Sequence, residues 1–277
     1  MSFTLAYSPC PNDTYVFAAL ANGLLPDAPD VRVVLSDIDE LNAAAARAEF
    51  ELIKVSYGAL PYLGDRYRIL RAGGALGRGC GPLLVARPAA SPPLFADFAR
   101  RRIAIPGERT TAFLLLQLAL GRRPAVEKMR FDAILPAVAQ GRVDAGLIIH
   151  ESRFTYREAG LIAIADLGEW WENLTLLPIP LGAIAVRDDV GDDDARALDD
   201  AIRASLAFAR AHDDAVMPYV RAHSTEMSED VARAHIELYV NEFTQDVGRI
   251  GIEAAHALFA RARDAGIVKH AAEPRFV

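Results

Sequence analysis

The feature that most constrains the fold is a regular alternation of short apolar runs with helical patterns. Strands are expected at Phe3–Tyr7, Val31–Leu35, Leu52–Val55, Leu83–Ala86, Arg102–Ile105, Ala145–Ile149, Ile162–Asp166 and Ala183–Arg187. Helices are expected at Thr14–Asn22, Ile38–Ala48, Tyr57–Leu63, Thr111–Leu120, Ile134–Gln140, Asp194–Ala211, Glu229–Val240 and Gly251–Ala265. Strands that alternate with helices predict an α/β fold with largely parallel sheets.

The length of 277 residues allows one large or two medium domains. The best boundaries are the loops at Pro88–Pro93 and Pro178–Gly182. Similar strands lie on both sides of these loops, so we expect a discontinuous layout. Residues 1–87 and 183–277 would form one lobe, and residues 88–182 a second lobe inserted into it. Bilobal solute-binding folds are built in this way, with the ligand between the lobes, but periodicity also allows one continuous doubly wound sheet.

Charge and composition argue against several kinds of partner. The net charge of −7 disfavours nucleic acid, whose partners normally present a basic face. Every apolar run is far shorter than the roughly 20 residues that span a bilayer, so no membrane insertion is expected. The N-terminus lacks a signal-peptide pattern, and Cys10 and Cys80 fit a reducing compartment, so we expect a cytoplasmic protein. These cysteines form no Cys/His cluster, and no metal site is expected.

Ligands of open α/β sheets bind outside the carboxyl ends of the strands, and four such junctions carry unusual residues. The first is SPCPNDTYVF, residues 8–17, in which two prolines make a stiff turn. Asn12 or Asp13 is expected to cap the helix that begins near Thr14. This turn would hold both polar residues at the rim of a cleft, although a rigid turn with a cap also explains the segment alone.

The second and third junctions are expected to place hydroxyl groups at helix N-termini. In ELIKVSYGAL, residues 51–60, Ser56 follows a strand, and in IAIPGERTTAF, residues 103–113, Thr110 and Thr111 open a helix. Helix N-termini offer free N–H groups and a favourable dipole to an anion or a polarised oxygen. Capping alone would explain Ser56 and one threonine, which leaves one threonine hydroxyl to spare.

The fourth junction is DAGLIIHESRF, residues 144–154, in which an apolar strand runs directly into His150. A histidine at the end of a buried strand can reach into the cleft, and its near-neutral pKa suits it to act as a general base. A ring satisfied by a backbone carbonyl is the alternative. Phe154 stands where the zincin motif HExxH needs its second histidine, so that metal site is absent. Only His235 competes as a site residue, and we interpret it as helix packing.

The segment RAGGALGRGCGPLLVA, residues 71–86, carries five glycines that would let the backbone approach a ligand closely. Its spacing matches neither the dinucleotide fingerprint nor the P-loop, which argues against a nucleotide. Arg78 in this segment could pair with a substrate carboxylate, as could Lys54 or Arg153. A solvated loop arginine is the alternative for Arg78.

These segments together resemble the 1,4-dihydroxy-6-naphthoate synthase family of the futalosine route to menaquinone. The resemblance rests on SPCPNDTYVF, KVSY, GGALGRGCGPL, ERTTAF, GLIIHESRFTY, DLGEWWE, IPLGAI and YVNEFTQDVG, which follow in the same order over nearly the whole chain. It implies a periplasmic-binding-protein-like fold of type II, in which two α/β lobes enclose a ligand cleft.

The resemblance also implies a carbon–carbon lyase that converts cyclic de-hypoxanthine futalosine to 1,4-dihydroxy-6-naphthoate without a metal or redox cofactor. In that family the histidine that matches His150 is the proton-abstracting base. The implied substrate contacts are Lys54, Val55, Ser56, Thr111 and Ala112, to which the first junction adds Asn12 and the glycine-rich segment adds Arg78. Two alternatives stay open: a chorismate dehydratase of the same pathway, and a solute-binding protein that captures a small anion. The oligomeric state is not indicated.

Overall fold

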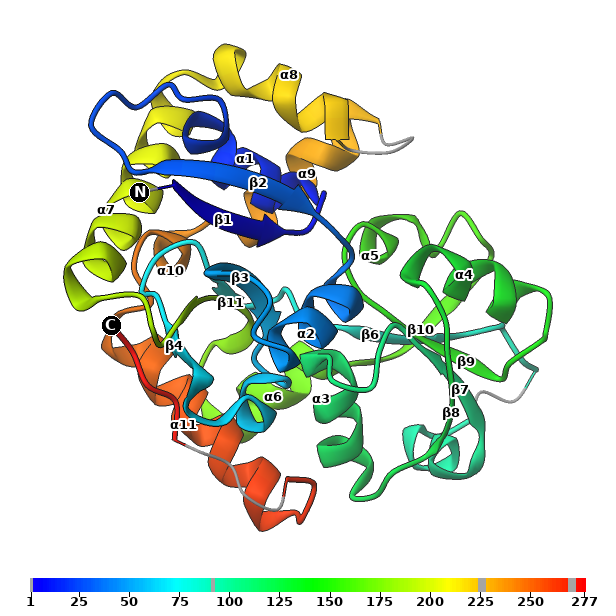
Figure 1. Cartoon of the computed structure of the whole chain (residues 1–277). Helices are drawn as coiled ribbons and strands as arrows, with labels where there is room; N and C mark the ends of the chain where they lie inside the picture. Colours follow the sequence, from blue (N-terminus) through cyan, green and yellow to red (C-terminus); the bar gives the residue numbers. More distant parts are fainter. Residues whose placement is uncertain (1, 91–92, 224–227, 269–272) are drawn as a thin grey trace.

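A computed structural model describes residues 2–90, 93–223, 228–268 and 273–277 (Figure 1). A first sheet has the strand order β2-β1-β3-β11-β4, with β5 paired to β11. Its strands are β1 (Ser2–Tyr7), β2 (Asp30–Leu35), β3 (Leu52–Ser56), β4 (Tyr67–Ile69), β5 (Ala75–Gly77) and β11 (Ile179–Arg187). A second sheet has the order β10-β6-β9-β7-β8. Its strands are β6 (Leu83–Ala86), β7 (Arg102–Ile105), β8 (Ala125–Lys128), β9 (Ala145–Ile148) and β10 (Ile162–Asp166).

The α/β class is confirmed, but the prediction of largely parallel sheets is wrong. β1 runs parallel to β2 and β3, and β7 runs parallel to β8 and β9. In contrast, β11 is antiparallel to β3, β4 and β5, and β6 is antiparallel to β9 and β10. Every antiparallel pairing involves β6, the strand by which the chain enters the second sheet, or β11, the strand by which it returns to the first.

The sheets change membership at places that differ from the predicted boundaries. β6 already belongs to the second sheet, although residues 1–87 were assigned to the first lobe. β11 begins at Ile179, before the predicted return at residue 183. The two-lobe division stays a prediction, and we now place its boundaries between β5 and β6 and just before β11. Residues 91 and 92 of the predicted boundary loop lie outside the described residues.

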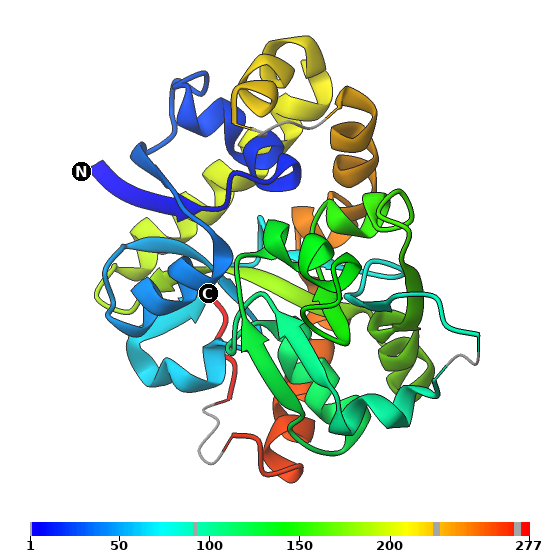
Figure 2. The same cartoon turned by 90° about the vertical axis from the view of Figure 1, so that its right-hand side faces the viewer.

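The helices cover both sheets (Figures 1 and 2). They are α1 (Pro11–Ala21), α2 (Ile38–Ala46), α3 (Thr111–Leu120), α4 (Phe131–Ala139), α5 (Ser152–Thr155), α6 (Leu167–Thr175), α7 (Asp192–Ala211), α8 (Asp213–His223), α9 (Glu229–Tyr239), α10 (Glu242–Gln245) and α11 (Gly248–Asp264). The helix expected at Tyr57–Leu63 is instead a turn with a short 3-10 segment, Leu60–Tyr62. In the described part of the chain, no helix has the length and apolar character needed to cross a bilayer.

Two hydrophobic cores fix the first sheet between its helices. Leu52 of β3 packs in a core with α1, α7 and α8, whereas its neighbour Ile53 faces the other core. That other core also contains Leu84 of β6, Leu114 of α3 and Phe259 of α11. One apolar core therefore joins the two sheets beside the site described next.

Candidate active site

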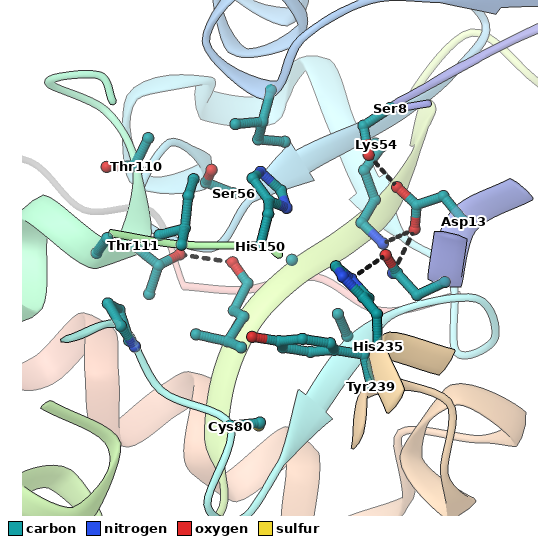
Figure 3. Close-up of a pocket in the computed structure, with 18 residues that line it drawn as sticks. Ser8, Asp13, Lys54, Ser56, Cys80, Thr110, Thr111, His150, His235 and Tyr239 are labelled. Atoms are coloured by element: carbon teal, nitrogen blue, oxygen red, sulfur yellow. Dashed lines mark hydrogen bonds and ion pairs between the residues drawn. The ribbon is translucent and has the colours of Figure 1, made fainter. Parts of the chain in front are cut away.

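A pocket of about 640 Å³, measured with the open space at its mouth, is lined by elements from both sheets. Strands β3, β5 and β11 of the first sheet form one part of its wall. The start of α3 and the segment after β9 form another, and α1, α2 and α9 complete it (Figure 3). Six of the eight predicted substrate or catalytic residues line it: Asn12, Lys54, Ser56, Thr111, Ala112 and His150.

The start of α1 differs from the predicted cap. Cys10 is the N-cap residue and Pro11 is the first residue of the helix, a position that suits proline because its missing N–H is not needed there. The prediction that Asn12 or Asp13 caps a helix beginning near Thr14 is therefore wrong. Both residues lie inside the first turn, where the carboxylate of Asp13 interacts favourably with the helix dipole.

Asp13 is the centre of a buried polar network on the pocket wall (Figure 3). Its carboxylate accepts hydrogen bonds from Nζ of Lys54 at 2.6 Å and from Oγ of Ser8 at 2.7 Å. It also accepts from Nδ2 of Asn12 at 2.8 Å. The side chains of Asp13 and Lys54 are only 2% and 5% exposed, so each charge is neutralised by the other rather than by water. Lys54 is therefore already paired before any ligand enters.

Strand β3 alternates between the pocket and the core. Lys54 and Ser56 line the pocket, whereas Val55 belongs to the core that joins the sheets. Val55 is therefore not a pocket-lining residue, although its backbone places its two neighbours.

Ser56 is positioned by a residue that sequence reasoning missed. The buried amide of Asn42 in α2 donates from Nδ2 to Oγ of Ser56 at 3.0 Å and accepts from the backbone N–H of Ser56 at 2.9 Å. Because the Ser56 oxygen accepts from Asn42, its own hydrogen is available to the pocket. No α-helix starts at Ser56, so both the predicted helix-dipole role and the capping alternative are wrong.

The hydroxyl groups of the two threonines at the start of α3 both form hydrogen bonds within the protein. Oγ1 of Thr110 accepts from the N–H of Phe113 at 3.2 Å and caps the helix. Oγ1 of Thr111 donates to the carbonyl of Leu181 at 2.6 Å and accepts from the N–H of Gly58 at 3.0 Å. The predicted spare hydroxyl is therefore absent.

What α3 offers to a ligand is its backbone. Within the described residues, the N–H groups of Thr111 and Ala112 have no protein acceptor, as expected for the first turn of a helix. Both residues line the pocket, so these two donors and the positive end of the helix dipole are available to an anion.

His150 follows β9 in a strained conformation. Its φ of 56° lies in the left-handed region, which is costly for residues other than glycine and is concentrated at functional sites. Nδ1 of the ring lies 3.3 Å from Sγ of Cys10, so the partner is a thiol and not a backbone carbonyl. Burial lowers the pKa of His150, while the carboxylates of Glu151, Asp13 and Asp37 oppose this shift. The imidazole is therefore neutral at neutral pH, as a base must be.

Cys10, His150 and Glu151 each bring one potential metal ligand to within 4.8 Å of the others. Burial, with Glu151 and Asp13 nearby, raises the pKa of the Cys10 thiol well above its ordinary value. Metals bind the thiolate form, which is disfavoured here, so the arrangement suits hydrogen bonding to His150 better than metal binding. The expectation of a metal-free site stays a prediction.

His235 lies in the pocket wall, which the interpretation as helix packing did not anticipate. Its side chain is buried, and Nε2 lies 3.1 Å from Oδ1 of Asn12 (Figure 3). The sequence does hold a signal: Ala232, His235 and Tyr239 form the buried stripe of α9, and a histidine on such a stripe needs a polar partner. Burial lowers the pKa of His235 well below its ordinary value, so it is neutral.

Two arginines predicted as partners of a substrate carboxylate lie outside the pocket lining. Arg78 donates to the carbonyl of Leu176 at 2.9 Å. Arg153 donates to the carbonyl of Gly81 at 2.6 Å and pairs with Asp166 at 2.7 Å. Of the residues that line the pocket, only Lys54 is positively charged, and Asp13 already neutralises it. A carboxylate in this pocket must therefore rely on neutral donors.

Three comparisons agree with this architecture. The model of a protein family described as menaquinone biosynthesis matches residues 3–264. A 1,4-dihydroxy-6-naphthoate synthase of Thermus thermophilus is 49% identical over 274 residues, which are 99% of this chain and 98% of the relative. The crystal structure of a protein from Archaeoglobus fulgidus has a TM-score of 0.90 at 35% identity, covering 96% of this chain and 98% of that one.

The fold is shared more widely than the sequence. The alkanesulfonate-binding protein of Xanthomonas axonopodis pv. citri has a TM-score of 0.73 at 14% identity, covering 96% of this chain and 94% of that one. The periplasmic-binding-protein-like fold expected from the sequence is thus confirmed. Together with the family match over almost the full length, it follows that the chain belongs to the 1,4-dihydroxy-6-naphthoate synthase family of menaquinone biosynthesis.

Proposed function

We propose that this protein is the carbon–carbon lyase that converts cyclic de-hypoxanthine futalosine to 1,4-dihydroxy-6-naphthoate, with His150 as general base. The observation that carries the proposal is the place of His150, held in a left-handed conformation on the wall of a pocket lined by both sheets. Burial lowers the pKa of this imidazole, which favours the unprotonated form that a base needs. Strained residues cluster at active sites and ligand clamps, and an unprotonated imidazole at this place is suited to proton abstraction.

The reaction needs a base, oxygen-binding donors and exclusion of water. Removing one proton and expelling the sugar-derived three-carbon fragment leaves an aromatic naphthalene, so aromatisation provides driving force. Nδ1 of His150 faces the Cys10 sulfur, which leaves Nε2 as the ring nitrogen that takes the proton. The nearby Glu151 carboxylate then stabilises the imidazolium that forms.

We place the substrate carboxylate at the start of α3. Ser56, Thr111 and Ala112 all line this part of the pocket, and the N–H groups of Thr111 and Ala112 have no acceptor among the described residues. A helix N-terminus binds an anion through its N–H groups and dipole without a cation. This assignment replaces the three basic candidates, because Lys54 is paired with Asp13 and the two arginines lie elsewhere.

The cytoplasm is the compartment we propose for this reaction. Both cysteines are free thiols and both are buried, which fits a reducing environment. With a net charge of −7 the protein is also poorly suited to a nucleic-acid partner, so its proposed partner is the small-molecule substrate alone.

The test is an anaerobic incubation of the purified protein with cyclic de-hypoxanthine futalosine, without added metal or nucleotide, followed by mass spectrometry. A parallel incubation contains chorismate. Formation of 1,4-dihydroxy-6-naphthoate is the expected result. Turnover of chorismate instead would identify the dehydratase alternative, and tight binding of the first compound without turnover would identify a capture protein.

A further inference from the structure

Nδ1 of His235 is a buried nitrogen without a partner at the wall of the pocket. In the described part of the chain, three buried side-chain atoms lack a hydrogen-bond partner: Nε of Arg68, Oε2 of Glu151 and Nδ1 of His235. Only His235 among these residues lines the pocket, and it is 1% exposed. Buried polar atoms are almost always paired in native proteins, so an unpaired one in a pocket wall indicates a partner that binds there.

The proton on this ring can be assigned from its neighbours. The carboxylate of Asp13, paired with Lys54, can only accept hydrogen bonds, so Asn12 must turn its NH2 group toward it. The carbonyl oxygen of Asn12 then faces Nε2 of His235. A carbonyl oxygen only accepts, so Nε2 carries the proton. Because the ring is neutral, Nδ1 is unprotonated and presents a lone pair.

The ring is held in place on several sides. Its centroid lies 4.6 Å from that of Tyr239 and 6.2 Å from that of Phe154. The ring of His150 is nearly parallel to it, with an interplanar angle of 14° and a centroid separation of 6.5 Å. The proposed base and this second imidazole therefore belong to the same pocket (Figure 3).

We propose that Nδ1 of His235 is a substrate-binding acceptor, which takes a hydrogen bond from a hydroxyl group of the substrate. The inference rests on the proposed function and adds to it the class of group recognised. A fixed, neutral Nδ1 accepts but cannot donate, so it selects a hydroxyl and rejects a carboxylate or a carbonyl at this place. The Asp13–Asn12 pair acts through the ring, because it fixes the tautomer.

Two substitutions test the roles of the two ring nitrogens of His235 separately. In His235→Gln the side-chain NH2 replaces Nε2, which keeps the bond to Asn12 and removes the acceptor. In His235→Asn the shorter amide reaches the Nδ1 position and offers its oxygen there, while the bond to Asn12 is lost. We expect H235Q to raise KM at least about tenfold with little change in kcat, since uniform binding is lost. H235N should lie closer to the wild type in KM.

The exposed His212→Gln is the matched control and should leave KM unchanged. Equal KM values for H235Q and the wild type would overturn the proposal, as would equal losses in H235Q and H235N. Thermal unfolding of each variant shows whether a change in its KM is caused by loss of the fold. Turnover by the wild type decides the proposed function separately, before the variants are compared.

A second readout does not depend on activity. In histidine labelled with 15N, the Nδ1 resonance of His235 should lie in the unprotonated range and move when 1,4-dihydroxy-6-naphthoate, which carries two hydroxyl groups, is titrated in. A protonated Nδ1 in the free protein, or a resonance that does not respond while the His150 resonance does, would contradict the assignment.

Discussion

Lys54 and Asp13 form a buried ion pair, with 2.6 Å between Nζ and Oδ1, that links β3 to the first turn of α1. Asp13 also orients Asn12, and Asn12 in turn orients His235. Through these bonds the pair helps to position His235, which lies to the right of His150 in Figure 3. It does so without leaving a free charge for a ligand.

Removing one member of this pair should destabilise the protein strongly. Lys54→Met leaves the Asp13 carboxylate buried and uncompensated, and we expect a loss of about 3–5 kcal/mol in the free energy of unfolding. The exposed pair of Arg123 and Glu108 provides the control, since Arg123→Met should cost at most about 1 kcal/mol. Urea unfolding measures both, and similar values for the two variants would contradict the role of the buried pair.

Asn42 should act through Ser56. Asn42→Leu removes both hydrogen bonds to Ser56, so the hydroxyl is no longer directed at the pocket. The hydrogen bond from Ser56 to the substrate is then lost. A cost of about 1–3 kcal/mol for that bond corresponds to a rise of roughly 5- to 150-fold in KM. Ser56→Ala should give a similar rise, and the double variant should add little because the two residues work as one unit. Additive effects in this double-mutant cycle would show that the residues act separately.

Much of the fold could be predicted from the sequence because buried strands leave a clear pattern. Leu83–Ala86, Arg102–Ile105 and Ile162–Asp166 were predicted with the bounds that β6, β7 and β10 have. The three-residue strands β4 and β5 are too short to show a period, and the exposed β8 lacks the apolar pattern. Strand direction was missed because it depends on where the chain crosses between sheets, which periodicity does not encode.

The site was most predictable at the junctions where a strand leads into the next segment. His150 and Ser56 stand at strand ends, and the sequence indicated both. Asn42 and His235 come from helices, and their roles depend on how α2 packs on β3 and how α9 packs on α1. Arg78 lies outside the pocket lining because its loop turns the guanidinium toward the carbonyl of Leu176, which the sequence pattern does not indicate.

The acid limb of the pH–rate profile should report His150. Burial lowers its pKa below the ordinary value of about 6.5, so activity should fall only when the pH drops through that lowered value. Glu151 raises the pKa of His150, so Glu151→Gln should move the limb to still lower pH. Glu158→Gln, near the end of the same segment and exposed, is the control. A limb that moves upward in E151Q, or stays in place, would be inconsistent with this electrostatic role.

The two neutral histidines of the pocket wall should make the protein sensitive to mild acid. Burial lowers the pKa of His150 and of His235 in the folded state, so below about pH 6.5 the unfolded chain binds protons that the folded chain does not. Stability is therefore complete above about pH 6.5 and falls as the pH decreases from there toward the folded-state values. Replacing His235 by Gln should flatten this slope in urea titrations between about pH 6.5 and 5; an unchanged slope would argue against a buried neutral ring.

The most direct test of the account is the turnover of His150→Asn. Asparagine tolerates the left-handed backbone of residue 150, so this variant removes the base without adding strain. With cyclic de-hypoxanthine futalosine as substrate, we expect kcat to fall by roughly 10²- to 10⁴-fold while the unfolding midpoint stays near that of the wild type. A His150→Asn variant that forms 1,4-dihydroxy-6-naphthoate at the wild-type rate would contradict the assignment of His150 as the base.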